Sequence, residues 1–247
     1  SIPDDGIALA NEIMKTGRLH RYNLEPDEQR QASMLETEFS QWQEVDYCLA
    51  CTSGGYAIQL ALRVCGVNPG DKVLANAYTL APVPGAIHNV GAEPVFVEID
   101  NSYHIDLDDL ENKSESSGAK FLLLSHMRGH IADMDKINLI CNRHGITLIE
   151  DCAHSPFVSI DDQYVGTFGD AAILSFFPTK PIPAGEGGLV ILKDHSKAEQ
   201  ARRLRDYGKY PLDGSLHHSL PALPNARMND FSAAIATLLK TQKPIDR

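Results

Sequence analysis

The strongest constraint on the fold is a repeated alternation between short apolar segments and segments with apolar residues at helical spacing. The segment 121–125 (FLLLS) is apolar almost throughout, which is typical of a strand buried on both faces of a parallel sheet. The segment 135–144 carries its apolar residues on one helix face, and Gly145 follows as a helix terminator. Repeated strand–helix units predict an α/β fold, a three-layer α/β/α sandwich with a mostly parallel sheet.

Seven strands are expected from this pattern, at 47–51, 72–77, 94–99, 121–125, 146–150, 171–176 and 188–192. A helix is expected after the first strand, beginning near Ser53 and ending at Gly66. The long irregular stretch 207–225 is a candidate active-site loop. In such sheets, ligands bind beyond the carboxyl ends of the strands.

Charge and composition exclude several classes of function. The 247 residues include 22 basic and 33 acidic side chains, a net charge of -11 that disfavours a nucleic-acid partner. There is no apolar run near the ~20 residues needed to span a bilayer, so no membrane partner is expected. The acidic start lacks the features of a signal peptide, and five cysteines suit reduced thiols. We therefore predict a cytoplasmic protein.

Three polar groups lie where predicted strands end. Ser53-Gly54-Gly55 opens a helix, whose free N–H groups favour an anion such as phosphate. Asp151 directly follows an apolar strand, and Lys180 lies between a Pro-rich and a Gly-rich turn, where loss of water would make its amine nucleophilic. Taken singly, each has an ordinary explanation as a turn glycine, a helix cap or a solvated lysine.

Metal binding is not expected. Cys48 and Cys51 form a lone CxxC, which cannot complete a tetrahedral zinc site without further ligands. Residues three apart on a strand point to opposite faces, which also argues against a redox pair. The ten histidines show no ligand spacing.

Together these segments resemble the DegT/StrS family of sugar aminotransferases, which belong to the fold-type I enzymes that use pyridoxal phosphate (PLP). The matching motifs occur in the same order as in the family and cover about residues 7–247. Their combination is specific to the family, whereas a single motif would not be. The matching stretches are TSGGYAIQLAL, VNPGDKVLANAYTLAPVPGAI, GAEPVFVEID, SHMRGHIADMDKI, LIEDCAHS, GTFGDAAILSFFPTK, GEGGLVI, RRLRDYG and PNARMNDFSAAIA.

The resemblance implies catalytic roles for two residues. Lys180 matches the lysine that forms an aldimine with PLP and later carries a proton between cofactor and substrate carbons. Asp151 matches the acid that pairs with the pyridinium nitrogen of PLP. This pairing keeps the nitrogen protonated, so that the ring can act as an electron sink.

The resemblance also implies how the phosphate is bound. Gly54 and Gly55 match its backbone cradle, and Ser175 matches a hydroxyl that also holds it. Asn225 matches an asparagine that reaches the phosphate in the neighbouring subunit. The family resemblance therefore implies a homodimer with shared active sites.

The implied reaction is a ping-pong transamination, in which glutamate or glutamine donates an amino group that is passed to a keto sugar. A nucleotide-linked sugar and a keto-sugar acid are both candidate acceptors, and the segment GRLHRYN resembles the branch that aminates eight-carbon keto-sugar acids. A related branch has histidine in place of the lysine and performs dehydration. The alternatives are a non-catalytic regulatory or assembly subunit that binds PLP or a nucleotide sugar, and a PLP-dependent dehydratase or cyclase.

Several positions depart from the family pattern. Leu80 stands where an aromatic residue usually stacks on the PLP ring, and Gly55 replaces a threonine of the phosphate cradle. His154 stands where a glutamine often contacts the PLP hydroxyl, and its charge depends on pH. Arg128 and His130 are more basic than the usual residues and form a candidate site for an anionic substrate group.

Three regions are expected along the chain. Residues 1–30 form an N-terminal arm or helix, and residues 31–228 form the PLP-binding large domain. Residues 229–247 begin the helix that leads, in the family, to a small C-terminal domain absent from this chain.

Overall fold

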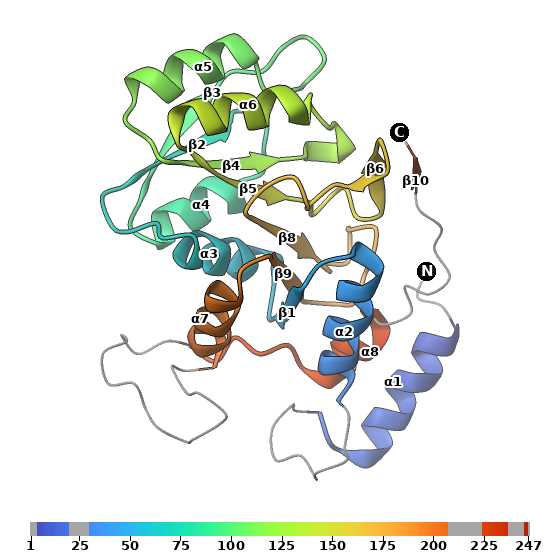
Figure 1. Ribbon diagram of the computed structural model, residues 1–247. Coiled ribbons are helices and arrows are strands. Elements are labelled where there is room, and N and C mark those ends of the chain that lie inside the picture. The colour runs from blue at the N-terminus through green and yellow to red at the C-terminus, as the bar shows by residue number, and fades with distance from the viewer. Residues whose placement is uncertain (1–3, 20–29, 207–223, 237–244, 247) are drawn as a thin grey trace.

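The structure is a computed structural model that describes residues 4–19, 30–206, 224–236 and 245–246 (Figure 1). Its helices are α1 (Asp4–Thr16), α2 (Gln31–Gln43), α3 (Gly54–Val64), α4 (Pro82–Asn89), α5 (Leu107–Ser116), the 3-10 turn η1 (Met127–Gly129), α6 (Met134–His144), α7 (His195–Arg205) and α8 (Asp230–Ala236). Its strands are β1 (Tyr47–Cys51), β2 (Lys72–Asn76), β3 (Glu93–Val97), β4 (Phe121–Ser125), β5 (Thr147–Asp151), β6 (Val158–Ile160), β7 (Gln163–Tyr164), β8 (Ala171–Ser175), β9 (Gly188–Leu192) and β10 (Ile245–Asp246).

One large sheet organises the molecule, with seven strands in the order β1-β9-β8-β5-β4-β2-β3. Strand β9 is antiparallel to both of its neighbours, β1 and β8. All other neighbouring pairs in this sheet are parallel. The carboxyl ends of six strands therefore meet at one edge, which confirms the mostly parallel sheet.

Helices cover both faces of this sheet (Figure 1). Because successive strand residues point to opposite faces, Val73 and Ala75 pack in the layer of α3, α4 and α7, whereas Leu74 packs with α5 and α6. Helix α2 covers the end of the sheet nearest β1, on the same face as α8. The α/β/α sandwich predicted from the sequence is thus confirmed.

The seven predicted strands all form, with boundaries within two residues of those expected. The helix predicted at 135–144 begins one residue earlier, and Gly145 ends it in the left-handed conformation (φ 62°). The β6–β7 hairpin was not predicted. Its two-residue turn places Asp161 and Asp162 at positive φ (48° and 63°), as a type I′ turn requires.

The structure describes two stretches of the carboxyl-terminal segment. Helix α8 covers 230–236, whereas Ile245–Asp246 form a short strand parallel to β6. Helix α8 thus begins at the start of the 229–247 segment, where the sequence predicts the start of a helix. Most of the loop expected at 207–225 lies outside the described residues.

The prediction that Cys48 and Cys51 point to opposite faces of the sheet is confirmed. Cys48 and Cys51 are both free and buried, and they belong to hydrophobic clusters on opposite faces of the sheet.

No helix within the described residues is long and apolar enough to cross a membrane.

A buried arginine joins three elements near β1. The guanidinium of Arg205 on α7 donates to Glu36 Oε1 on α2 (2.7 Å), to the Ala50 carbonyl on β1 (3.1 Å) and to Asp206 Oδ1 (2.9 Å). Arg205 is only 4% exposed. Removal of its charge leaves the buried Asp206 carboxylate and the partly buried Glu36 carboxylate without this partner, which is far more costly than the loss of a surface pair.

We predict that Arg205→Ala lowers the free energy of unfolding by about 3–5 kcal/mol, measured by urea denaturation. The matched control is Arg143→Ala, because Arg143 is solvent-exposed and its bond to Glu111 is worth at most about 1 kcal/mol. Equal losses in the two variants would contradict this assignment.

Candidate active site

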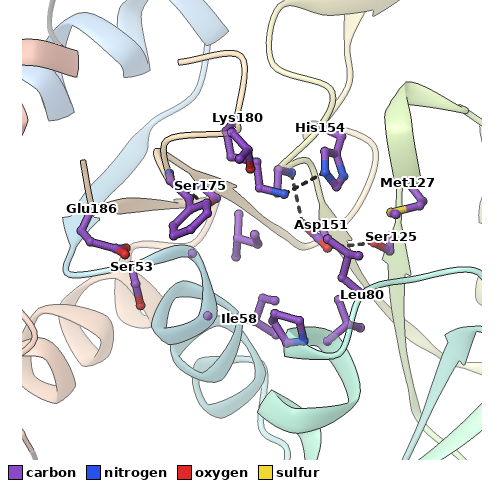
Figure 2. A pocket seen from close by; sticks show the side chains of 18 residues that line it. Ser53, Ile58, Leu80, Ser125, Met127, Asp151, His154, Ser175, Lys180 and Glu186 are labelled. Atoms are coloured by element: carbon purple, nitrogen blue, oxygen red, sulfur yellow. Dashed lines mark hydrogen bonds between the residues drawn. The ribbon is translucent and has the colours of Figure 1, made fainter. Parts of the chain in front are cut away.

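A cavity of about 340 Å³ lies at the carboxyl edge of the large sheet (Figure 2). Figure 2 shows Lys180, His154 and Asp151 gathered together, with Leu80 and Ile58 across the cavity and Ser53 and Glu186 toward one end. The lining residues are Ser53, Gly54, Gly55, Ile58, Leu80, Pro82, Val83, Ser125, Met127, Asp151, Ala153, His154, Ile173, Ser175, Phe177, Thr179, Lys180 and Glu186.

Lys180 is presented by the connection between β8 and β9. This connection is closed at its base, because Phe176 N donates to the Gly187 carbonyl (2.9 Å) and Ala184 N donates to the Phe176 carbonyl (2.9 Å). The Phe176 side chain is fully buried and anchors the loop. Lys180 N donates to the Phe177 carbonyl (2.8 Å), which closes a turn around the lysine.

The Lys180 amine lies 2.8 Å from His154 Nε2. Burial lowers the pKa of Lys180, and the charge of Asp151 opposes this effect. Burial, followed by the charge of Lys180, lowers the pKa of His154. At neutral pH His154 is therefore neutral, and its Nε2 accepts a hydrogen bond from the amine. The pair thus gives Lys180 a nearby acceptor that carries no charge.

Asp151 lies at the end of β5 and is 6% exposed. Its Oδ2 accepts a hydrogen bond from Ser125 Oγ (2.8 Å), and its Oδ1 accepts one from Ala153 N (3.1 Å). Each carboxylate oxygen thus has one protein donor, and each retains a lone pair. The site holds a fixed acid that faces the cavity and can accept a further hydrogen bond.

The first turn of α3 forms another part of the cavity wall. Ser53 caps this helix, since its Oγ accepts from Tyr56 N (3.2 Å). A Cβ on Gly54 would lie 2.5 Å from Ser175 Cβ, whereas a Cβ on Gly55 would meet nothing within 4 Å. The absence of a side chain therefore lets β8 approach at Gly54 and leaves open space at Gly55. Free N–H groups at a helix start favour an anion in that space.

Within the described residues, His126, Glu150 and Cys152 are close enough together to bind a metal ion. The Glu150 carboxylate already accepts from Gly166 N (2.9 Å), from Gly169 N (2.7 Å) and from His126 if that ring nitrogen is protonated. Burial, followed by the charge of Glu150, raises the pKa of Cys152 well above its usual value. A neutral thiol and a hydrogen-bonded carboxylate are poor ligands, so we interpret this group as structural.

The structure brings together seven of the residues singled out from the sequence, namely Gly54, Gly55, Leu80, Asp151, His154, Ser175 and Lys180. Three others do not line the cavity. Arg128 is an exposed residue of η1 at positive φ (53°), and its charge helps to lower the pKa of His154. His130 packs against the rings of Tyr103 and His104. Asn225 is exposed and accepts from Arg227 N (3.3 Å).

Sequence reasoning missed several lining residues. Ser125 ends a predicted apolar strand, and a polar residue at a strand end is the signal that identified Asp151, so Ser125 could have been found. Met127 and Phe177 carry no comparable signal, because an apolar residue after a strand is usual in any core.

The fold and the cavity define a class of protein: an α/β domain that holds an amine, an acid and a helix N-terminus around one pocket at the strand ends. The chain belongs to the DegT/DnrJ/EryC1/StrS aminotransferase family, whose sequence model matches residues 5–242.

Named relatives extend this assignment. The chain is 36% identical over 206 residues to a pleiotropic regulatory protein of Geobacillus stearothermophilus, covering 83% of this chain and 54% of that protein. It is 34% identical over 206 residues to a UDP-N-acetyl-3-dehydro-alpha-D-glucosamine 3-aminotransferase of Acidithiobacillus ferrooxidans, covering 83% and 55%.

Among solved structures, DesV of S. venezuelae in complex with a ketimine intermediate superimposes with a TM-score of 0.80 and 31% identity, covering 94% of this chain and 60% of DesV. The chain thus spans about half the length of the two curated relatives and somewhat more of DesV.

We predict that Lys180 reacts with an amine-labelling reagent at lower pH than Lys136 does. Lys180 has a lowered pKa, whereas a hydrogen bond and the charge of Asp133 raise the pKa of Lys136. Since only the neutral amine reacts, the pH of half-maximal labelling follows the pKa. Labelling over a pH series, read by peptide mass spectrometry, compares both lysines in one sample. A Lys180 midpoint at or above that of Lys136 would refute the prediction.

We predict opposite effects for alanine at the two adjacent glycines. Gly54→Ala forces a Cβ against Ser175 and lowers the free energy of unfolding by about 1–3 kcal/mol. Gly55→Ala meets open space in a helix and raises it by about 0.4–1 kcal/mol. Urea denaturation of the protein without added ligand measures both, and a loss at Gly55 as large as at Gly54 would show that the cradle is packed differently.

Proposed function

We propose that this chain is the PLP-binding part of an aminotransferase that moves an amino group from glutamate or glutamine to a keto sugar. The observation that carries the proposal is the Lys180 amine, which lies beside His154 and shares its cavity with the Asp151 carboxylate. Family membership supports the same reaction class.

The residues present fit PLP by their chemistry. Lys180 would hold the cofactor aldehyde through its amine, and Asp151 would accept a hydrogen bond from the ring nitrogen. Ser175 and the first-turn amides of Gly54 and Gly55 would bind the phosphate, and the open space at Gly55 supports this. Leu80 would give apolar contact with the ring, and His154 would donate to its hydroxyl.

When bound, PLP supplies an electron sink that stabilises negative charge on the carbon bearing the amino group. The protein supplies the proton transfer. Because burial lowers the pKa of Lys180, its amine gives up a proton more readily than a solvated lysine does, which suits a group that accepts and returns a proton. The Asp151 carboxylate would accept a hydrogen bond from the ring nitrogen, and Leu80, Ile58 and Ile173 would give the cofactor apolar walls.

We propose an acceptor class from the name of one relative, and a mode of assembly from the family resemblance. The Acidithiobacillus relative is named for a UDP-linked amino sugar, which supports a nucleotide-linked acceptor for this chain. We propose a homodimer in which Asn225 reaches the partner's site, since this residue is exposed and lies outside its own cavity. Arg128 and His130 remain proposed contacts for an anionic substrate group.

The three-part division of the chain also remains a proposal, with an arm at 1–30, the PLP-binding domain at 31–228 and a final segment at 229–247. Helix α1 lies in the proposed arm and packs on α8. The free cysteines support a reducing compartment, and we propose the cytoplasm.

A second function is favoured by one observation. The Geobacillus relative is named a pleiotropic regulatory protein, which supports the alternative of a regulatory subunit that binds PLP or a nucleotide sugar without turnover. A dehydratase or cyclase would use the same cofactor residues, and product analysis would separate it from a transaminase.

We predict that the protein purified with added PLP shows the visible absorbance band of lysine-bound PLP. We also predict that glutamate or glutamine removes this band. Lys180→Ala abolishes the band, because no other lysine lines the cavity in the described residues. Absorbance spectra before and after the amino donor measure both effects. Return of the band on addition of a ketone then identifies the acceptor.

The matched control is Lys136→Ala, which removes an exposed lysine and leaves the band intact. A band that forms but resists every amino donor would favour the regulatory subunit or another PLP reaction. Absence of a band in the unmodified protein would refute the enzyme proposal for this chain.

A further inference from the structure

A buried asparagine takes the place of sheet hydrogen bonds where β2 and β4 separate. The register between these strands extends to the pair Ala75–Leu123. One residue further along β2, Asn76 Oδ1 accepts from Ser125 N (2.8 Å), and Asn76 Nδ2 donates to the Ser125 carbonyl (3.1 Å). Asn76 is only 2% exposed. Its side chain therefore holds the main chain of Ser125 at the point where the cavity opens.

The same asparagine also holds the opposite wall of the cavity. Its Nδ2 donates to the Tyr78 carbonyl at 2.9 Å. Tyr78 lies in the short connection between β2 and α4, two residues before Leu80, which lines the cavity. A single buried amide group thus links the end of β4 to the loop that carries Leu80.

Ser125 passes this constraint on to the acid. Its Oγ donates to Asp151 Oδ2 at 2.8 Å, and Ser125 and Asp151 are register partners on β4 and β5. A donated hydrogen bond stabilises the negative charge of the carboxylate and limits rotation of its side chain. Both residues are buried, at 5% and 6% exposure, so water does not easily replace the missing donor.

We propose that Asn76 and Ser125 are positioning residues that set the orientation of the Asp151 carboxylate toward the ring of the bound cofactor. This inference rests on the proposed function. Asn76 acts through Ser125, and Ser125 acts through Asp151. We therefore expect that removal of the Asn76 or the Ser125 side chain leaves Lys180 able to bind PLP, but that the PLP ring is then poorly oriented.

The test uses the PLP-loaded protein and four variants. Ser125→Ala removes the donor to Asp151, and Ser125→Thr keeps a hydroxyl at the same position. Asn76→Ala removes the support behind Ser125 while Asp151 and Ser125 stay intact. Ser114→Ala is the matched control, because Ser114 is a buried serine on α5 whose hydroxyl has no hydrogen-bond partner.

The main readout is the visible circular dichroism of bound PLP at equal occupancy, because this signal reports the orientation of the ring in the site. We expect Ser125→Ala and Asn76→Ala to reduce it. We also expect the loss of the absorbance band with glutamate to slow by about 10- to 100-fold, as for other small misplacements of reacting groups. Ser125→Thr recovers most of both signals, and Ser114→Ala retains them.

The outcomes are distinguishable. If Ser125→Ala keeps the dichroism and the rate of the unmodified protein, the positioning role is wrong and the proposed function stands. If the unmodified protein binds no PLP, the proposed function and this inference both fail. Asn76→Ala leaves several buried main-chain groups without partners; if it does not fold, the Ser125→Ala and Ser125→Thr pair decides the question alone.

Discussion

The site depends on two adjacent carboxylates at the end of β5 that point to opposite faces of the sheet. Glu150 is fully buried and is held by the amides of Gly166 and Gly169 and by His126. These bonds tie the segment before β8 to β5. Because neighbouring strand residues alternate in direction, locking Glu150 on one face directs Asp151 to the other, where the cavity lies. One carboxylate is thus used for structure, and the next is available for chemistry.

The geometry of the sheet explains why the other functional groups meet Asp151. Parallel strands bring their carboxyl ends to one edge, and the start of α3 lies at that edge because the helix follows β1 directly. Strand β9 returns antiparallel to β8, so the connection between them stays at the same edge instead of crossing the sheet. Lys180 lies on this connection, which is why a lysine outside any strand faces the acid.

The sequence predicted those site residues that directly follow an apolar run. Asp151 and the glycines after β1 are of this kind, since a polar or glycine residue that follows a buried strand is recognisable without knowledge of its neighbours, whereas Ser175 was identified through the family resemblance. The role of Asn76 was not predictable in this way. Its side chain bonds to a residue 49 positions away, and that contact arises from the order of strands in the sheet, which periodicity does not contain.

The class of fold and the positions of the strands follow from the sequence alone, because hydrophobic periodicity and turn residues are local properties of the chain. The sequence also determined, through a combination of motifs, the family. The tertiary structure alone decided which strand ends are neighbours, that Lys180 contacts His154, and that Arg128 and His130 stand outside the cavity. These are contacts between distant segments, and they are set by strand order and side-chain packing rather than by any local pattern.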